Sequence, residues 1–125
     1  MPERAMPGID WPAVGLGTVA AAVIALALLV GSGVAHADIG PIAEIVGVVA
    51  GGYVAGLRAR IAGAAHGALV AAALIVVLGL GVLPQPGVAG NVVADTALTV
   101  LSDLVVLAAG TGGGWLATRG ASLAR

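Results

Sequence analysis

The sequence of 125 residues contains no cysteine, no lysine and no phenylalanine. The absence of cysteine excludes disulfide bonds and thiolate chemistry. Charged residues make up only 9% of the chain, whereas about 25% is usual in soluble domains. The net charge of −1 also lacks the basic excess that marks nucleic-acid binding, so we expect no nucleic-acid partner.

Hydrophobic residues are abundant instead, at 60% of the chain, and the mean hydropathy is +1.14. A domain of this size leaves much of its surface exposed, so it could not hide so many apolar side chains from water. The chain also contains 21 glycines, and residues this small favour close contact between helices in lipid. We therefore expect the lipid bilayer to be the solvent of this protein.

Four apolar stretches predict membrane-spanning helices, over residues 12–34, 41–57, 64–83 and 92–118. Each is near the length of about 17 to 25 residues that one crossing needs, and the last is longer. We expect the last helix to project from the membrane, tilt or bend, and Gly112 to Gly114 to loosen or break it near its inner end. The predicted fold is an all-α bundle of four transmembrane helices in a single domain.

The segment Ala35-His36-Ala37 offers an alternative reading of the first span, because its A-x-A form resembles a signal-peptidase site. The apolar run before it is longer than a signal sequence needs, and the residues that precede the run include acids. We favour a retained first span and leave cleavage open.

The arginines predict the topology. Four spans place both termini on one side, and if that side is cytoplasmic every arginine lies inside, as the positive-inside rule requires. These topology-setting residues are Arg4, Arg58, Arg60, Arg119 and Arg125. We expect the amino and carboxyl termini to be cytoplasmic and the protein to lie in the cell membrane.

An internal repeat is also indicated. A shift of 59 residues lays 44–60 on 103–119, so that Glu44 meets Asp103 and Gly51 meets Gly110. The first and third spans match at Gly17 and Gly67, among other positions. The chain therefore resembles a duplicated helical hairpin with parallel halves, although helices rich in alanine, valine and glycine resemble one another in any case.

Glu44 and Asp103 are the sharpest polar features of the spans. Each lies 16 residues before an arginine, about 24 Å along a helix, so neither can pair with it. On the last helix Thr99 and Ser102 share a face with Asp103, and we expect that face to point into the bundle. Glu44, Asp103, Thr99 and Ser102 form the candidate intramembrane polar site.

Two functions of this site stay open. Acids within a membrane often mark a path for protons or cations. The other reading is a protonated or hydrogen-bonded pair that fixes the register of two helices. We favour the second, because translocating acids usually come with more polar companions than this chain supplies.

Glycines spaced four residues apart predict seams where two helices pack closely. The candidate packing residues are Gly47, Gly51, Gly52, Gly56, Gly110 and Gly114, and Gly63 with Gly67 has the same spacing. Gly47 and Gly51 share a face with Glu44, so that face is expected to be a packing seam.

The remaining polar residues predict no catalysis. His36 and His66 are expected at opposite membrane faces, where they cannot share a metal ion, and we interpret His66 as an interfacial residue. The sequence contains no nucleophile paired with a base and no cofactor motif. We therefore expect no enzymatic activity, no cofactor and no metal site.

The segments IDWPAVGLG, GPIAEIVGVVAGGYVAGL and AGAAHGALVAA, with a glycine-rich last helix, carry a family resemblance. The chain resembles a family of small four-span membrane proteins common in haloarchaea and catalogued as a domain of unknown function. The resemblance covers nearly the whole chain and implies a membrane bundle without a known activity. Glu44 stands where a small or apolar residue is expected in that family.

These observations predict a structural or accessory membrane protein that acts through helix packing, with itself as a homo-oligomer or with a larger membrane complex. The alternative is a small proton- or cation-coupled transporter or channel that uses Glu44 and Asp103.

Overall fold

The computed structural model describes residues 8–34, 39–79 and 92–123. These residues form four helices and no strand, which confirms the predicted all-α bundle. The helices are α1 (Trp11–Val34), α2 (Gly40–Ala59), α3 (Gly63–Gly79) and α4 (Val92–Leu123).

The observed helices follow the predicted spans closely where the structure describes them. α1 and α2 begin one residue before the predicted spans, and α4 extends to Leu123, beyond the predicted end at 118. The predicted end of the third span, residues 80–83, lies outside the described residues, as does the whole of Ala35-His36-Ala37 with its possible cleavage site.

Local sequence signals explain how the helices begin and end. Asp10 caps α1, because its Oδ1 accepts a hydrogen bond of 3.0 Å from the backbone N–H of Ala13. α2 has a proline in its first turn, where the missing N–H does no harm. α2 ends at Arg60, which takes a left-handed conformation with φ 56° and donates its backbone N–H to the carbonyl of Gly56.

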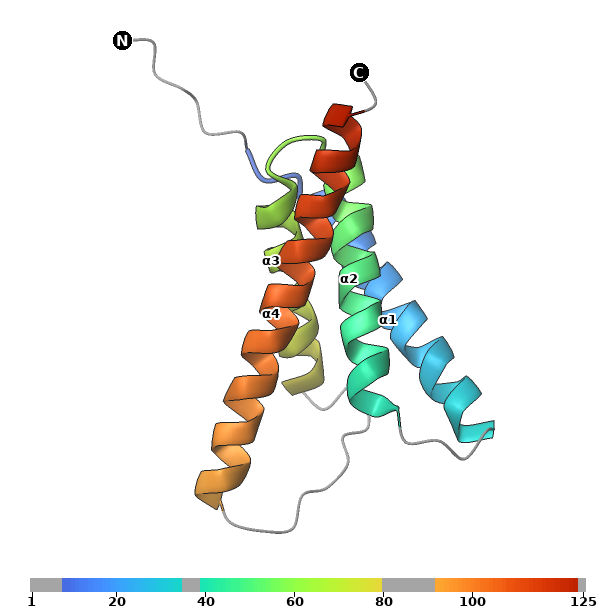
Figure 1. Cartoon of the computed structure of the whole chain (residues 1–125), viewed down its shortest axis with the longest axis vertical. Coiled ribbons are helices and arrows are strands. Elements are labelled where there is room, and N and C mark those ends of the chain that lie inside the picture. Colours follow the sequence, from blue (N-terminus) through green and yellow to red (C-terminus); the bar gives the residue numbers. More distant parts are fainter. Residues whose placement is uncertain (1–7, 35–38, 80–91, 124–125) are drawn as a thin grey trace.

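The helices are arranged around a central pair (Figure 1). α2 and α3 contact each other, α1 packs on one side of this pair, and α4 packs on the other. Within the described residues α1 and α4 do not touch. The largest fully buried side chains are Leu74, Val48, Val70 and Val106, which come from α2, α3 and α4. Figure 1 shows the helices close together near the chain termini and spread apart at the opposite end.

The expectation that Gly112 to Gly114 would loosen or break the last helix is wrong. α4 continues unbroken for 32 residues, about 48 Å. Gly113 and Gly114 are buried against the backbones of α2 and α3, and this packing outweighs the weak helix propensity of glycine. The helix is longer than a bilayer core of about 30 Å, as the sequence predicts.

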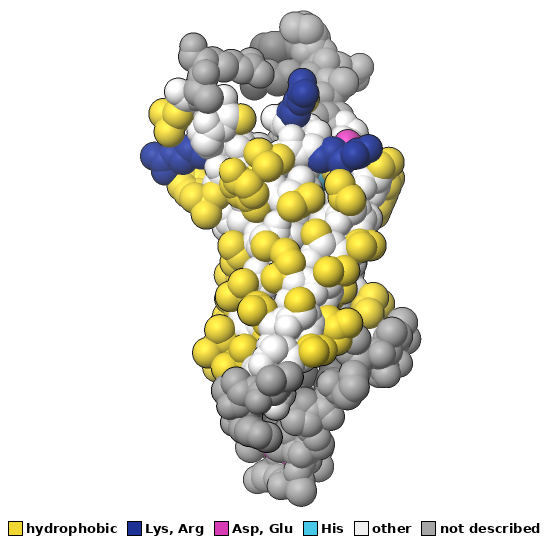
Figure 2. All heavy atoms as spheres, turned by 90° about the vertical axis from the view of Figure 1, so that its right-hand side faces the viewer, with side chains coloured by type: hydrophobic (Ala, Val, Ile, Leu, Met, Phe, Trp, Pro, Cys, Tyr) yellow, Lys and Arg dark blue, Asp and Glu magenta, His cyan; other side chains and the backbone are white. Residues whose placement is uncertain are grey.

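The surface of the bundle suits a lipid environment. α1, α2 and α4 are long and apolar enough to cross a membrane, and α3 is apolar but shorter within the described residues. Figure 2 shows hydrophobic side chains over the middle of one face and the basic side chains near one end. The chain therefore has the features of a multi-pass membrane protein.

Candidate functional site

The predicted glycine seams are the places where the helices approach most closely. A methyl group added to Gly52 would lie 2.5 Å from the carbonyl oxygen of Gly110, and one on Gly56 would lie 2.7 Å from that of Gly114. Both distances are too short for a real contact, so any larger residue would push α2 away from α4. Gly63 and Gly67 of α3 meet the same two glycines from the other side. We call Gly52, Gly56, Gly63, Gly67, Gly110 and Gly114 the glycine crossing.

A second seam joins α1 to α2. A methyl group on Gly47 would lie 2.6 Å from the carbonyl oxygen of Ala21, and Gly51 is equally close to the backbone of Gly17. α2 therefore uses two glycine pairs, one on each of two sides, to bind two different helices. The expectation that Gly47 and Gly51 form a packing face is confirmed.

The two hairpins repeat the same contact. Gly17 faces Gly51 in the first hairpin, and Gly67 faces Gly110 in the second. These are the residues that the predicted repeat places at equivalent positions. The neighbouring alanines also correspond, since Ala21 lies beside Gly51 and Ala71 lies beside Gly110. This equivalence supports the predicted duplication of a helical hairpin.

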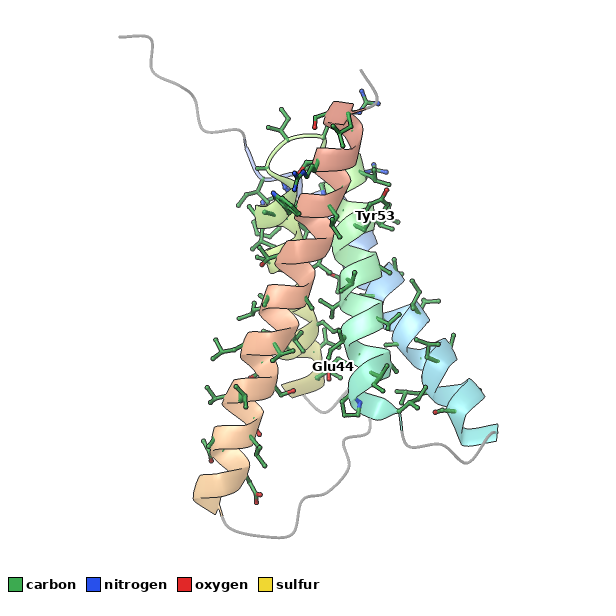
Figure 3. All side chains as sticks on the ribbon, in the orientation of Figure 1. Glu44 and Tyr53 are labelled. Atoms are coloured by element: carbon green, nitrogen blue, oxygen red, sulfur yellow. The ribbon has the colours of Figure 1, made fainter. Side chains whose placement is uncertain are left out.

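Glu44 and Asp103 come from different helices but lie within electrostatic range of each other. Both side chains are half-buried. Figure 3 shows Glu44 on the side of α2 that faces α3 and α4. Within the described residues, neither carboxyl group forms a hydrogen bond or an ion pair with a protein side chain. The two acids therefore interact electrostatically, and no described side chain supplies a cation to either of them.

The two hydroxyl residues of the predicted site do not join this pair. Thr99 and Ser102 are exposed, and the Thr99 hydroxyl donates a hydrogen bond of 2.9 Å to the carbonyl of Asp95 in its own helix. The expectation that this face of α4 points into the bundle is wrong for both residues. All of the residues 96–102 are exposed in this part of α4, whereas Asp103 is half-buried.

Ser32 of α1 also forms no hydrogen bond with Glu44. It is buried, but its hydroxyl donates to the carbonyl of Leu29 at 2.8 Å, within its own helix. Because the Ser32 hydroxyl donates its proton within its own helix, it does not donate a hydrogen bond to Glu44.

Three arginines occupy the opposite end of the bundle. Arg58, Arg60 and Arg119 are all exposed, and Arg4 and Arg125 lie outside the described residues. The guanidinium carbon of Arg119 lies 4.8 Å from the centre of the Trp115 ring, a cation–π contact at the level where interfacial aromatic residues gather. The structure thus separates a basic end, which we call the arginine end, from the carboxylate end with Glu44 and Asp103.

His66 has a structural role that the sequence does not reveal. It is only 3% exposed, and both of its ring nitrogens are used. Nε2 accepts a hydrogen bond of 3.0 Å from the backbone N–H of Asp10, and Nδ1 lies 3.0 Å from the carbonyl of Ala62. Because a carbonyl only accepts, Nδ1 carries the proton and the ring is neutral. His66 therefore ties the start of α1 to the start of α3.

No sequence signal could have revealed this tie, because its partner is a backbone N–H far away in the chain. The cap formed by Asp10, in contrast, has a readable pattern: an aspartate followed by tryptophan and proline at the start of an apolar run.

Within the parts of the chain that the structure describes, no group of three or more acids, histidines or cysteines could hold a metal ion. Comparison with family models, with curated proteins and with solved structures gives no match. The resemblance to the haloarchaeal four-span family therefore stays a prediction, and the site must be interpreted from its own chemistry.

Proposed function

We propose that this chain is a multi-pass protein of the cell membrane with both termini in the cytoplasm, and that it acts as a structural or accessory subunit through helix packing. One observation carries this proposal. The inner glycines of the bundle are all occupied by contacts within the chain, whereas the outer half of α4 has apolar side chains that no described helix covers.

The outer half of α4 is suited to bind another helix. The part of α4 that precedes Asp103 is about 10 Å longer than the part of α2 that precedes Glu44. Its exposed apolar residues include Leu98, Leu101 and Leu104. These residues recur at helical spacing, so they form a stripe along one helix. A partner helix would cover this stripe and leave the glycine crossing unchanged.

Photo-crosslinking in native membranes tests the accessory role. A photo-reactive residue at Leu101 is expected to give a defined crosslinked product, because this side chain would face the partner. The matched control is the same residue at Val23, an exposed position on α1. Equal products from both positions, or only the free chain from Leu101, would contradict the proposal.

The cytoplasmic position of the arginine end has its own test. Since the chain has no cysteine, a single Arg58→Cys substitution creates a unique site for a membrane-impermeant thiol reagent. The proposal expects labelling only after the cells are opened. Labelling of intact cells would show that the arginine end faces the outside, which is the opposite topology.

A second function is favoured by the approach of Glu44 to Asp103 across two helices. Two acids within electrostatic range of each other and without a hydrogen-bonded partner in the described chain could exchange protons or hold a cation. The experiment is proton and cation flux in proteoliposomes, with Glu44→Gln and Asp103→Asn as variants. A transporter would lose flux in both variants, whereas background flux in all three proteins would remove this function.

A further inference from the structure

The third side of α2 carries an apolar groove of about 440 Å³. Its lining is Ile45, Val46, Val49, Ala50, Tyr53 and Val54. The other sides of the helix pack on α1, α3 and α4, with glycine contacts to α1 and α4. The lining comes from α2 alone, so the groove is open to the surrounding membrane.

The two ends of the groove differ chemically. Ile45 and Val46 lie at the carboxylate end, and Tyr53 and Val54 lie toward the arginine end. Tyr53 is 42% exposed, and Figure 3 shows it on the side of α2 opposite to Glu44. Within the described chain its hydroxyl has no hydrogen-bond partner. Arg58 follows Val54 by one helical turn and is exposed. The groove thus combines an apolar floor with a polar and cationic end.

The groove runs along the middle of α2. From Ile45 to Val54 the helix rises about 14 Å, which is close to the length that a hydrocarbon chain has in one leaflet of a core about 30 Å thick. Arg58 lies one turn beyond Val54, near the end of α2, and its long side chain reaches the phosphates. Tyr53 lies about 8 Å closer to the middle of the helix than Arg58.

We propose that this groove binds one hydrocarbon chain of an anionic membrane lipid, while Arg58 and the Tyr53 hydroxyl hold the phosphate of its headgroup. The proposal rests on the membrane location of the protein, and it does not depend on the accessory role. Arg58 supplies the positive charge that an anionic phosphate needs, and no acid lines the groove.

A second copy of the chain fits this surface less well. Close packing of two helices in lipid requires small residues at the contact. The groove contains one alanine and no glycine, and its other lining residues are bulky. All four glycines on the central part of α2 (Gly47, Gly51, Gly52 and Gly56) already face α1 or α4. A flexible hydrocarbon chain fills such an irregular surface more readily than a rigid helix does.

Native mass spectrometry of the full-length protein in detergent tests the proposal. The purified protein is mixed with phosphatidylglycerol or with phosphatidylcholine of the same acyl chains, and retained lipid is counted. We expect one molecule of phosphatidylglycerol to be retained about fivefold more strongly than phosphatidylcholine, the size of effect that one arginine near an anionic headgroup gives.

Two pairs of variants separate the headgroup from the chain. Arg58→Gln is expected to remove this preference, whereas Arg119→Gln, whose guanidinium packs on Trp115, should keep it. Val46→Phe fills the groove and should weaken retention of both lipids about equally. Val23→Phe, on an exposed part of α1, is the matched control and should retain both as the unchanged protein does. Because Val46 and Val23 are exposed, neither substitution disturbs the core.

Four results would overturn the proposal. Equal retention of the two lipids by the unchanged protein would remove the headgroup site. If Arg58→Gln and Arg119→Gln weakened the preference for phosphatidylglycerol equally, the headgroup would be attracted to the arginine end in general and not bound at Arg58. Competition by free glycerol phosphate at the lipid concentration, or a dimer abolished by Val46→Phe, would show that the groove binds no lipid chain. None of these results bears on the crosslinking of Leu101, so the accessory role stands or falls separately.

Discussion

The two ends of the bundle differ in how the helices meet. At the arginine end, glycines bring three helices into backbone contact, and buried His66 joins two helix starts. At the carboxylate end the helices spread apart, and half of α4 is covered by no described helix (Figure 1). Glycine by itself does not cause the difference, because Gly31 and Gly33 lie at the spread end with nothing near them.

This contrast shows what close packing in lipid requires. Lipid chains are as apolar as leucine, so burying a leucine between helices gains little over leaving it in the bilayer. Contact energy comes instead from atoms that fit closely, which two facing glycines permit. Within the described residues the carboxylate end has no pair of facing glycines, and it carries two acids within electrostatic range of each other, so it has less to hold it together.

The largest effect should come from the glycine crossing. Gly114→Ala places a methyl group against the backbone of Gly63, so we expect a loss of about 2 kcal/mol or more in stability. Gly112→Ala is the matched control, because nothing lies near this position and alanine favours the helix, which should raise stability by about 0.5–1 kcal/mol. Thermal unfolding in detergent measures both. A change in stability of the same sign for the two substitutions would contradict this account of the glycine crossing.

A smaller effect is expected from the histidine tie. His66→Ala leaves the backbone N–H of Asp10 without its acceptor in a part-buried position, which should cost about 1–3 kcal/mol. The loss should also expose the start of α1, which faster amide exchange at Asp10 to Ala13 would reveal. Unchanged exchange there would show that the cap formed by the Asp10 carboxylate is sufficient.

The acids should give a change of the opposite sign. Glu44→Gln removes a half-buried carboxyl that lies within electrostatic range of Asp103, so it should raise stability, and Asp103→Asn should raise it by a smaller amount because it removes only the interaction with Glu44. The double variant should gain less than the sum of the two, because the first substitution already removes the repulsion. Additive gains in the same unfolding assay would show that the two acids do not interact.

The exposed hydroxyl residues should matter least. Thr99→Val and Ser102→Ala should each change stability by less than about 0.5 kcal/mol, because both side chains are exposed and the Thr99 bond stays within its own helix. Transport, if the carboxylate pair performs it, should also be unaffected. A loss of flux in either variant would show that the substituted residue belongs to the polar site.

Much of the fold could be predicted, because the signals are local. The apolar runs and the prolines defined the helices nearly to the residue, and Gly47 with Gly51 gave the side of α2 that packs on α1. The candidate site was predicted less well. The approach of Glu44 to Asp103 agreed with the repeat, but the exposure of Thr99 and Ser102 depends on how far α4 extends past its neighbours.

The amino-acid sequence by itself determined the number of helices, their apolar surface and the separation of the arginines from the acids. Each of these properties depends on the order of residue types along one segment. Only the tertiary structure decided which helix each packing glycine faces and that His66 is buried. The reason is that a glycine or a histidine acquires its role from the backbone group opposite it, and that group belongs to a distant part of the chain.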